Sequence, residues 1–428
     1  MLVKRFPLFY GWIIVGIGII GMTLTYGTRH SFSVFFPAIL NEFGWSRGST
    51  ALMLSLNILI YGFTAPFAGF LVDRWKPRKV LPIGVMILSF TTAFCAFATE
   101  LWHFYIFFGF LVPIGIALSG WPVLAPTIAN WFTKKRGLAL GIGGMGAGIS
   151  YVYGLFVEFV ISRVGWHYAY IVIGALLLVV LIPLYLLLYH YRPQDRGLQP
   201  YGSDVIATDK GGSIESSDRL VPAFPIWTLR RAAKTYQLWL LVASHSFHWG
   251  MAAYLVLAHQ VRFAIDVGYS SLFAASVFAM FGVFMTVGLL LGFISDWIGR
   301  EWTATIANLL TIGAIIALLF VNDTSQPWLL YIYAVCLGLG SGIFSPTITA
   351  GEADLFHGKS FGAIAGLSLA GVGVGAVMGP WLGGWIYDVT GSYLPAFFFC
   401  IACFILSLVT FWVAAPRNAS RLPRLKNT

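Results

Sequence analysis

Apolar runs with at most one charged residue alternate with polar segments along most of this chain. Twelve of the runs reach the roughly 18 residues that a helix needs to cross a bilayer core about 30 Å thick. The predicted spans lie near residues 10–37, 50–72, 80–98, 102–129, 137–161, 168–189, 239–263, 272–295, 303–320, 328–350, 361–386 and 394–414. The pattern therefore predicts an all-α membrane protein with twelve transmembrane helices, the first of which ends at Pro37.

The longest polar segment separates two halves of six spans each. Residues 192–220 contain no apolar run, and their polar and small residues are typical of flexible linkers. We predict a six-helix bundle in residues 1–190, a cytoplasmic linker in 191–235 and a second six-helix bundle in 236–428.

The two halves repeat each other weakly. The segment GFLVD at 69–73 returns as GFISD at 292–296, and PTI at 126–128 returns at 346–348. The two offsets are almost the same, and the glycine-rich fifth span is echoed by a glycine-rich eleventh span. Because an internally duplicated helical bundle is typical of secondary transporters, we expect two pseudo-symmetric six-helix bundles.

The amino-acid composition fits residence in a membrane. Hydrophobic residues make up 58% of the 428 positions and charged residues only 10%, against about 25% charged residues in a typical soluble domain. The four cysteines all fall inside apolar spans, where we expect them to be packing residues. The pattern GxGxxG at 141–146 also lies inside a span with no strand before it, so it is not expected to bind a dinucleotide. The sequence shows no convincing metal cluster, nucleophile motif or soluble catalytic domain, so no cofactor and no enzymatic activity are expected.

The basic residues are distributed by side of the membrane. With the N-terminus placed in the cytoplasm, all but four of the 26 Lys and Arg residues fall on the side of the termini and the linker. The exceptions are Arg29, Arg47, Arg163 and Arg262. Because positive charge marks cytoplasmic loops, we predict cytoplasmic N- and C-termini in a plasma membrane, such as a bacterial inner membrane. The net charge of +10 then reports topology and not a nucleic-acid partner.

An arginine and a histidine interrupt the first apolar span. Arg29 and His30 follow 18 uncharged residues, and they lie about 28 Å along a helix that begins near Tyr10. A cation at that depth is costly unless it faces protein or a water-filled cavity. Arg29 could snorkel to the interface, pair with Glu158 as a structural bridge or gate, or bind an anionic substrate.

Two histidines lie near the middle of the seventh span. His245 and His248 are three residues apart, a spacing that puts both on one face of an α-helix. We predict that His248, which precedes Trp249, contacts substrate, with His245 as the second candidate; structural hydrogen bonds are the alternative. A metal site would need further ligands, and because none lies nearby in the sequence, no metal is expected.

Further polar and aromatic groups at membrane depth could complete a substrate site. These candidates are Tyr26, Asn57, Tyr61, Ser119, Trp121, Tyr151 and Tyr331. Aromatic side chains also form packing contacts and interface belts in membrane proteins, which is the alternative at each of these aromatic positions.

The duplicated loop carries a family signature. The run GFLVDRWKPRK at 69–79, with a weaker copy at 292–300, resembles the signature of the major facilitator superfamily. The resemblance implies two six-helix domains that move around a central site lined by spans 1, 4, 7 and 10. It also implies a conformational role for charged loop residues, because an acidic group at a helix end can hold neighbouring cations and helix termini. These gating candidates are Asp73, Arg74, Arg78, Asp296 and Arg300.

Within that superfamily the chain resembles the monocarboxylate-transporter-like branch and the neighbouring oxalate–formate exchangers. The matching segments include 31–36, 42–47, 130–132 and 391–393. The resemblance implies that His30 occupies the position of a functional lysine in animal members. Their aspartate–arginine pair in span 8 has no counterpart here.

A fixed cation with hydroxyl donors in a mostly apolar cavity suits a small carboxylate. We therefore predict a monomeric secondary active transporter of small organic anions, monocarboxylate-like, which works by alternating access with proton symport. Histidine is suited to the proton coupling. The alternative is an exporter of drugs or other amphipathic compounds by proton antiport, for which a large aromatic cavity suffices. The expected partners are the substrate, protons and the lipid bilayer.

Overall fold

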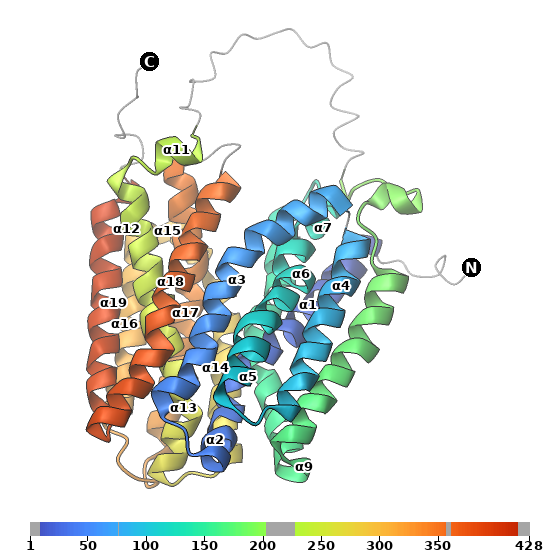
Figure 1. Cartoon of the computed structure of the whole chain (residues 1–428). Coiled ribbons are helices and arrows are strands. Elements are labelled where there is room, and N and C mark those ends of the chain that lie inside the picture. Colours follow the sequence, from blue (N-terminus) through green and yellow to red (C-terminus); the bar gives the residue numbers. More distant parts are fainter. Residues whose placement is uncertain (1–8, 76, 203–226, 357–360, 418–428) are drawn as a thin grey trace, which may run out of the picture.

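The computed structural model describes residues 9–75, 77–202, 227–356 and 361–417. Within these ranges the chain is almost entirely helical and forms no β-sheet. Eleven helical segments of the described chain are long and apolar enough to cross a membrane. They stand side by side in two groups (Figure 1). Below, the end of the molecule that carries the short helix α11 (Leu229–Ala232) is called the linker end, and the opposite end, which carries α2 (Phe32–Phe43), the distal end.

The first half of the chain supplies the helices of the first bundle. Span 1 is α1 (Tyr10–His30) continued by α2, span 2 is α3 (Arg47–Trp75), and span 3 is α4 (Pro77–Phe94) with the 3-10 turn η2 (Cys95–Phe97). Span 4 consists of α5 (Leu101–Phe104), the π-helical η3 (Tyr105–Leu111), α6 (Val112–Ser119) and α7 (Trp121–Trp131). Pro37 lies inside α2, so the prediction that the first span ends there is wrong; Gly44, at φ 64°, ends it instead.

The next helical stretch contains two spans joined by a turn. α8 (Arg136–Gly144) leads into α9 (Gly146–Pro183), which the π-helical η4 (Leu184–Leu188) continues. α9 has 38 residues, which makes about 57 Å of helix, nearly twice the thickness of a bilayer core. Inside it, Gly165 departs from helical geometry at φ 83° and ψ 165°, a conformation that glycine adopts most readily. The chain turns there, so the eleven segments contain the twelve crossings that the sequence predicts.

The second half of the chain follows a 3-10 turn, η5 (Pro193–Arg196), and α11. Span 7 consists of α12 (Tyr236–His245), the π-helical η6 (Ser246–Ala253) and α13 (Tyr254–Val267). Span 8 is α14 (Ser271–Leu291), and α15 (Ile294–Ile298) lies in the loop after it. Spans 9 to 12 are α16 (Arg300–Leu319), α17 (Pro327–Phe356), α18 (Phe361–Thr390) and α19 (Leu394–Ala414).

Besides α2 with α13, two longer helix pairs join the bundles, α3 with α18 and α9 with α14. Both pairs approach closely because glycine lies at the contact. A Cβ added to Gly148 of α9 would lie 2.9 Å from the backbone N of Thr286, and one on Gly282 of α14 would lie 2.5 Å from the backbone O of Gly148. In the other pair, a Cβ added to Gly384 of α18 would lie 2.5 Å from the backbone N of Gly48 in α3. Each glycine-rich span thus has a glycine that faces the other bundle: Gly148 in the fifth span and Gly373 in the eleventh.

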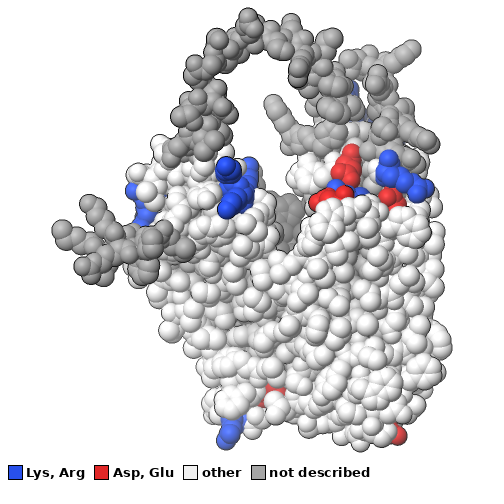
Figure 2. Space-filling view, turned by 180° about the vertical axis from the view of Figure 1, so that it is seen from behind, with Lys and Arg blue, Asp and Glu red and all other residues white. Residues whose placement is uncertain are grey.

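Charged side chains gather at the two ends of the molecule and leave a broad uncharged belt between them (Figure 2). Large apolar side chains of the spanning helices are exposed, among them Phe67, Val179 and Phe398, with relative exposures of 57%, 72% and 56%. Apolar exposure on this scale is stable against lipid and not against water. The chain is therefore a multi-pass membrane protein.

Candidate substrate site

A cavity of about 350 Å³ lies between the two bundles. Its walls come from spans 1, 2, 4 and 5 of the first bundle and spans 7, 8, 10 and 11 of the second. Spans 1, 4, 7 and 10 are those expected to line the cavity, and spans 2, 5, 8 and 11 line it as well. Its polar and aromatic lining consists of Tyr26, Arg29, His30, Tyr61, Trp121, Tyr151, His245, Trp249, Tyr254, Ser345 and Thr349. The lining parts of α8, α14 and α17 belong to the linker-end portions of those helices, and the surface is hollowed between the bundles at that end (Figure 2).

Arg29 is the buried cation of this cavity. It lies in the last turn of α1, and only 2% of its surface is exposed. Its Nε donates to the Oδ1 of Asn57 at 2.7 Å, and the Nδ2 of Asn57 donates to the backbone O of Phe108 at 2.7 Å. The second bond commits the amide nitrogen of Asn57, so that its oxygen faces the arginine. Asn57 does not line the cavity itself; it orients the guanidinium that does.

Three tyrosines surround the guanidinium of Arg29. Its Cζ lies 4.3 Å from the centre of the Tyr61 ring and 5.6 Å from that of Tyr26, and the group hydrogen-bonds to the hydroxyl of Tyr254. Aromatic faces attract cations without neutralising them. The Nη2 of Arg29 is buried and has no hydrogen-bond partner among the described residues. A buried donor in this state is costly until an acceptor reaches it.

His30 lies beside Arg29 in the cavity wall. Its Nδ1 is 2.8 Å from the Oγ of Ser150, and the Ser150 hydroxyl donates to the backbone O of Ala147. Because the serine proton is used in that second bond, Nδ1 of His30 is the donor and Nε2 is the acceptor of a neutral ring. The ring also stacks on Tyr151, with 3.9 Å between ring centres. The imidazole is thus fixed in both position and tautomer.

The two histidines of span 7 point in different directions, which contradicts the predicted shared face. His245 lines the cavity, and its Nδ1 lies 3.0 Å from the Oγ of Ser368. The π-helical segment η6 begins directly after His245. A π-helix is wider than an α-helix, so positions three residues apart no longer share one face.

His248, the first choice from the sequence, is fully buried and does not line the cavity. Its Nδ1 lies 3.1 Å from the Oδ1 of Asn308 and its Nε2 lies 3.3 Å from the Oγ of Ser341. The ring stacks on Phe344 with 4.0 Å between centres. Both ring nitrogens are therefore occupied inside the second bundle, and of the two histidines only His245 lines the cavity.

The remaining candidates from the sequence divide by position. Trp121 and Trp249 line the cavity, and the Nε1 of Trp249 donates to the Oγ of Ser345 at 3.0 Å. Ser119 is buried outside the cavity, where its hydroxyl donates to a backbone carbonyl of its own helix. Tyr331 lies on the outer surface with 42% of its area exposed. The structure therefore brings neither Ser119 nor Tyr331 into the site.

Sequence reasoning missed Tyr254, which contacts Arg29 from the second bundle. Tyr254 follows Trp249 by five residues, the spacing of one π-helical turn. An α-helical interpretation of span 7 separates these two side chains, whereas the π-helical segment brings both to the cavity. Ser345 and Thr349, which lie one turn apart on α17 and also line the cavity, were likewise not among the candidates from the sequence.

Arg29 and Glu158 do not form the bridge that the sequence allowed. Arg29 takes part in no ion pair in the described part of the chain. The carboxyl group of Glu158 hydrogen-bonds instead to Ser271, in the first turn of α14, and so joins the two bundles. The Arg29–Glu158 pair, one of the alternatives that the sequence left open, is thus not formed among the described residues in this conformation. A gating role for Glu158 stays a prediction.

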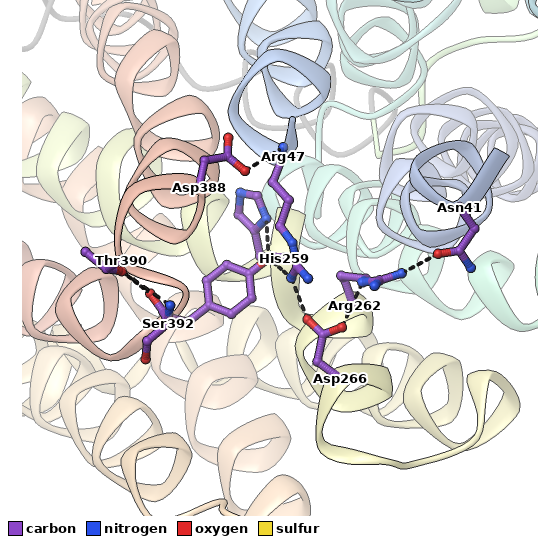
Figure 3. Close-up of polar contacts among 9 residues, drawn as sticks. Asn41, Arg47, His259, Arg262, Asp266, Asp388, Thr390 and Ser392 are labelled. Atoms are coloured by element: carbon purple, nitrogen blue, oxygen red, sulfur yellow. Dashed lines mark hydrogen bonds and ion pairs between the residues drawn. The ribbon is translucent and has the colours of Figure 1, made fainter. Parts of the chain in front are cut away.

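The distal end is closed by polar contacts between the bundles (Figure 3). Arg47, at the start of α3, pairs with Asp266 of α13 at 2.5 Å and donates to the hydroxyl of Tyr393 at 2.8 Å. Asp388 of α18 accepts the backbone N–H groups of Arg47 and Gly48 at 2.9 and 2.8 Å. A carboxylate at the N-terminus of α3 is favourable because it meets free N–H groups and the positive end of the helix dipole.

A second arginine extends this closure (Figure 3). Arg262 donates to the Oδ1 of Asn41 at 2.7 Å and pairs with Asp266 at 2.9 Å. Behind these residues the Nδ1 of His259 lies 3.2 Å from the hydroxyl of Tyr393. The cavity is thus closed toward the distal end and hollowed toward the linker end, which is one of the two arrangements that alternating access requires.

The gating candidates from the loop signature lie at the linker end. Arg300 pairs with Asp296 at 2.5 Å, within the second bundle. Arg74 and Arg78 are exposed and form no ion pair with any residue that the structure describes. The side chain of Asp73 lies outside the described part of the chain. The conformational roles of all five residues stay predictions.

The sequence matches the family model described as Major Facilitator Superfamily over residues 18–357 and 286–427. The chain belongs to the major facilitator superfamily. Its fold is also found in a solved structure of a bacterial homologue of the human lysosomal transporter Spinster, in an inward-facing and unoccupied conformation. The TM-score is 0.69 at 19% identity, over 96% of this chain and 97% of that one. This likeness concerns the fold alone.

Several curated members of the superfamily are similar in sequence to this facilitator. Monocarboxylate transporter 13 of Bos taurus is 25% identical over 394 residues, which cover 91% of this chain and 85% of that protein. Monocarboxylate transporter 11 of Homo sapiens is 25% identical over 416 residues, with coverages of 95% and 83%. YcxA of Bacillus subtilis (strain 168), named as an uncharacterized MFS-type transporter, is 22% identical over 387 residues, with 89% of each chain covered. This facilitator is accordingly a membrane transporter and not an enzyme.

Proposed function

We propose that this transporter carries small organic monoanions, monocarboxylates among them, by alternating access coupled to protons. The observation that carries the proposal is the guanidinium of Arg29, which is buried at the cavity with an Nη2 that no described residue accepts from. The described lining of the cavity contains no Asp or Glu that could neutralise this charge. A substrate carboxylate would supply both the acceptor and the negative charge.

One fixed cation favours a substrate with one negative charge. In a mostly apolar cavity, the second carboxylate of a dicarboxylate would be desolvated without a cationic partner, which is costly. Arg29 is the only Lys or Arg in the described lining. We therefore expect dicarboxylates to bind much more weakly than monocarboxylates of the same size.

The size and the walls of the cavity indicate an apolar body for the substrate. Its volume of about 350 Å³ is at the small end of the usual range for ligand pockets, roughly 300 to 1,000 Å³. Tyr26, Tyr61, Trp121 and Trp249 present aromatic surface to it. Rings or short alkyl chains attached to the carboxylate would bury apolar area against these walls.

Two histidines in the lining support proton coupling. His30 and His245 each keep one ring nitrogen hydrogen-bonded to a serine and lie within the cavity wall. Histidine is the side chain that changes charge most readily near neutral pH. A proton taken up with a monoanion makes the combined cargo neutral, and a neutral cargo costs less to carry through a region of low dielectric constant. Proton symport follows from this charge balance.

The aromatic walls also favour a second candidate, an exporter of drugs or other amphipathic compounds by proton antiport. Such a cargo would bind through the same rings, Tyr61 and Trp249 among them. Its affinity would not depend on Arg29 if the cargo is neutral. The unpartnered Nη2 of Arg29 has no role in that mechanism, and we therefore place the organic-anion function first.

The orientation in the membrane is part of the same proposal. We infer from the positive-inside rule that the linker end, with both termini, faces the cytoplasm across a plasma membrane such as a bacterial inner membrane. In that orientation the described conformation is open to the cytoplasm. We further propose that residues 1–190 and 236–428 are the two moving domains of a monomeric transporter, linked by residues 191–235.

Uptake into proteoliposomes tests the proposed function. The labelled panel would hold a short-chain monocarboxylate, an aromatic monocarboxylate, a dicarboxylate of matched size and a neutral amphiphile, each with and without an imposed pH gradient. Accumulation of a monocarboxylate, increased when the external side is acidic, would support the proposal. Movement of the amphiphile without any organic acid would favour the exporter. Empty liposomes and the Arg29→Ala variant serve as controls.

A further inference from the structure

A second buried ionisable group lies close to the cavity but outside it. Glu352, on the linker-end part of α17, has 2% of its surface exposed. Its Oε1 is buried without a hydrogen-bond partner among the described residues, and none of their ion pairs includes it. Its carboxyl group forms one side-chain hydrogen bond, to Ser368 of α18. A carboxylate in this position would be a buried charge with a single neutral partner.

Ser368 connects Glu352 to the cavity. The Oγ of Ser368 lies 3.0 Å from the Nδ1 of His245, and His245 is part of the cavity lining. Helices α17, α18 and α12 thus bring a carboxyl group, a hydroxyl group and an imidazole into one hydrogen-bonded chain. A serine hydroxyl accepts one hydrogen bond while it donates another, so a proton can pass along this chain.

The charged groups around this chain are already engaged elsewhere. On α16, Arg300 pairs with Asp354 at 2.9 Å, and the carboxylate of Glu301 accepts the backbone N–H of Arg417 at 2.9 Å. On η6, His248 has both ring nitrogens occupied. Arg230 and Arg231 of α11 are exposed at the linker end, and Arg29 lies across the cavity. Because no ion pair of the described residues includes Glu352, a proton is the group that can compensate its charge there.

We propose that Glu352 binds the proton that is transported with the substrate, and that Ser368 and His245 form its path to the cavity. This assignment rests on the proposed proton coupling. In the loaded state the carboxylic acid donates to the Oγ of Ser368, and the serine donates to the Nδ1 of His245. On release, the Glu352 proton passes to Ser368 while the serine proton passes to Nδ1. The products are a carboxylate and an imidazolium, which gives its Nε2 proton to water in the cavity.

The coupling follows from the position of the chain. His245 and Arg29 both line the cavity, so an anion held by Arg29 lies in the same small volume as the end of the proton path. The anion stabilises a positive charge on His245 and favours proton entry. Departure of the anion removes that stabilisation and favours proton release. Neither step requires an ion pair within span 8, which has no Lys or Arg in this chain.

The substitution Glu352→Gln tests the assignment, because it keeps the shape of the side chain and removes its proton. Accumulation driven by a pH gradient should fall by about tenfold or more, as for the loss of a proton-transfer group. Exchange of labelled for unlabelled substrate at equal pH on both sides needs no net proton movement and should fall much less. Ser368→Ala should slow the gradient-driven uptake in the same selective way. Gradient-driven uptake equal to that of the parent in Glu352→Gln would overturn the assignment.

Glu301→Gln is the matched control, because Glu301 is another buried glutamate of the same bundle and its carboxylate is held by a backbone N–H. It should leave the ratio of gradient-driven uptake to exchange unchanged. An equal loss of both activities in Glu352→Gln would show a structural role and contradict the assignment. Substrate exchange by the parent without any effect of the pH gradient would overturn the assignment and leave the substrate proposal standing.

Infrared difference spectroscopy of the purified protein decides the point without any transport assay. Between mildly acidic and mildly alkaline pH, the parent should show a carboxylic-acid carbonyl band that Glu352→Gln lacks and Glu301→Gln keeps. If the parent transports no organic acid at all, the proposed function fails, and this band still reports whether Glu352 exchanges a proton. Absence of a band specific to Glu352 would contradict the inference.

Discussion

The Nε of Arg29 and the Oδ1 of Asn57 lie 2.7 Å apart, joined by a buried hydrogen bond between α1 and α3. Asn57 is fully buried, and its Nδ2 is committed to the backbone O of Phe108. A neutral amide holds the guanidinium in place and leaves its charge intact. The arrangement fixes one edge of the cation and keeps the charge available for a ligand.

This relationship makes Asn57→Asp a sharp test of the anion site. Aspartate has almost the same shape as asparagine. Its carboxylate, which would contact Arg29 from outside the cavity, would neutralise the guanidinium and so compete with the substrate. We expect the affinity for a monocarboxylate to fall about 30-fold or more, as for the loss of a charge pair. Isothermal titration with the purified variant measures this. Asn308→Asp is the control, because Asn308 is also fully buried but lies outside the cavity. Parent-like affinity in Asn57→Asp would contradict the site.

The contacts of Arg47 should hold the distal end closed. Arg47→Ala removes the pair with Asp266 and the bond to Tyr393, and it should shift the protein toward a state that is open at the distal end. A cysteine at Ser33, buried between α2 and α13, should then react with an impermeant reagent from that side about 5- to 150-fold faster, for a coupling of about 1–3 kcal/mol. The background must lack the four native cysteines.

Arg163→Ala is the matched control for the distal closure. Arg163 is an exposed arginine at the same end, and it lies over the ring of Phe159 in its own bundle. Its removal should leave the labelling rate at position 33 unchanged. Equal rates in the parent and the Arg47→Ala variant would show that the contacts between the bundles do not limit opening.

Gly282→Ala should destabilise the described conformation. The new methyl group would lie 2.5 Å from the backbone O of Gly148, between α14 and α9, and overpacking of this kind costs about 1–3 kcal/mol. The melting temperature of the purified protein in detergent should fall. Gly313→Ala is the control, because a Cβ at Gly313 meets no atom within 4 Å. Similar melting temperatures for the two variants would argue against a tight α9–α14 contact.

The topology predicts which loops are reached from outside the cell. A cysteine at Lys210, in the linker segment outside the described residues, should stay unmodified by an impermeant reagent on intact cells. A cysteine at Arg163, at the distal end, should react. The opposite result would invert the proposed orientation and place the open side of the cavity outside the cytoplasm.

Much of the fold follows from the sequence. The apolar runs predict the twelve crossings, and the repeated loop predicts two related halves. The glycine-rich fifth and eleventh spans indicate close helix contacts, and the structure places Gly148 and Gly373 where the bundles meet. These features depend on hydrophobicity and on residue size, which a sequence displays directly. The depth of Arg29 could be predicted for the same reason, because it depends only on the length of the uncharged run before it.

The composition of the site depends on geometry that the sequence does not display. The sequence of span 7 predicts α-helical periodicity, whereas the π-helical η6 separates His245 from His248 and brings Tyr254 to the cavity. The partner of Arg29 was also sought among the acids, in Glu158, when the structure supplies the neutral Asn57. Charge alone cannot distinguish a cation that is neutralised within the protein from one that is held for a ligand.

The affinity of purified Arg29→Ala for a monocarboxylate from the transport panel tests the anion site most directly. Removing the buried charge should cost about 2–5 kcal/mol of binding, which is roughly a 30- to 4,000-fold rise in the dissociation constant. Arg29→Lys should recover part of the affinity, because an ammonium lacks the planar fork of a guanidinium. The control Arg163→Ala should bind like the parent. Binding of the monocarboxylate by Arg29→Ala with the affinity of the parent would contradict the account.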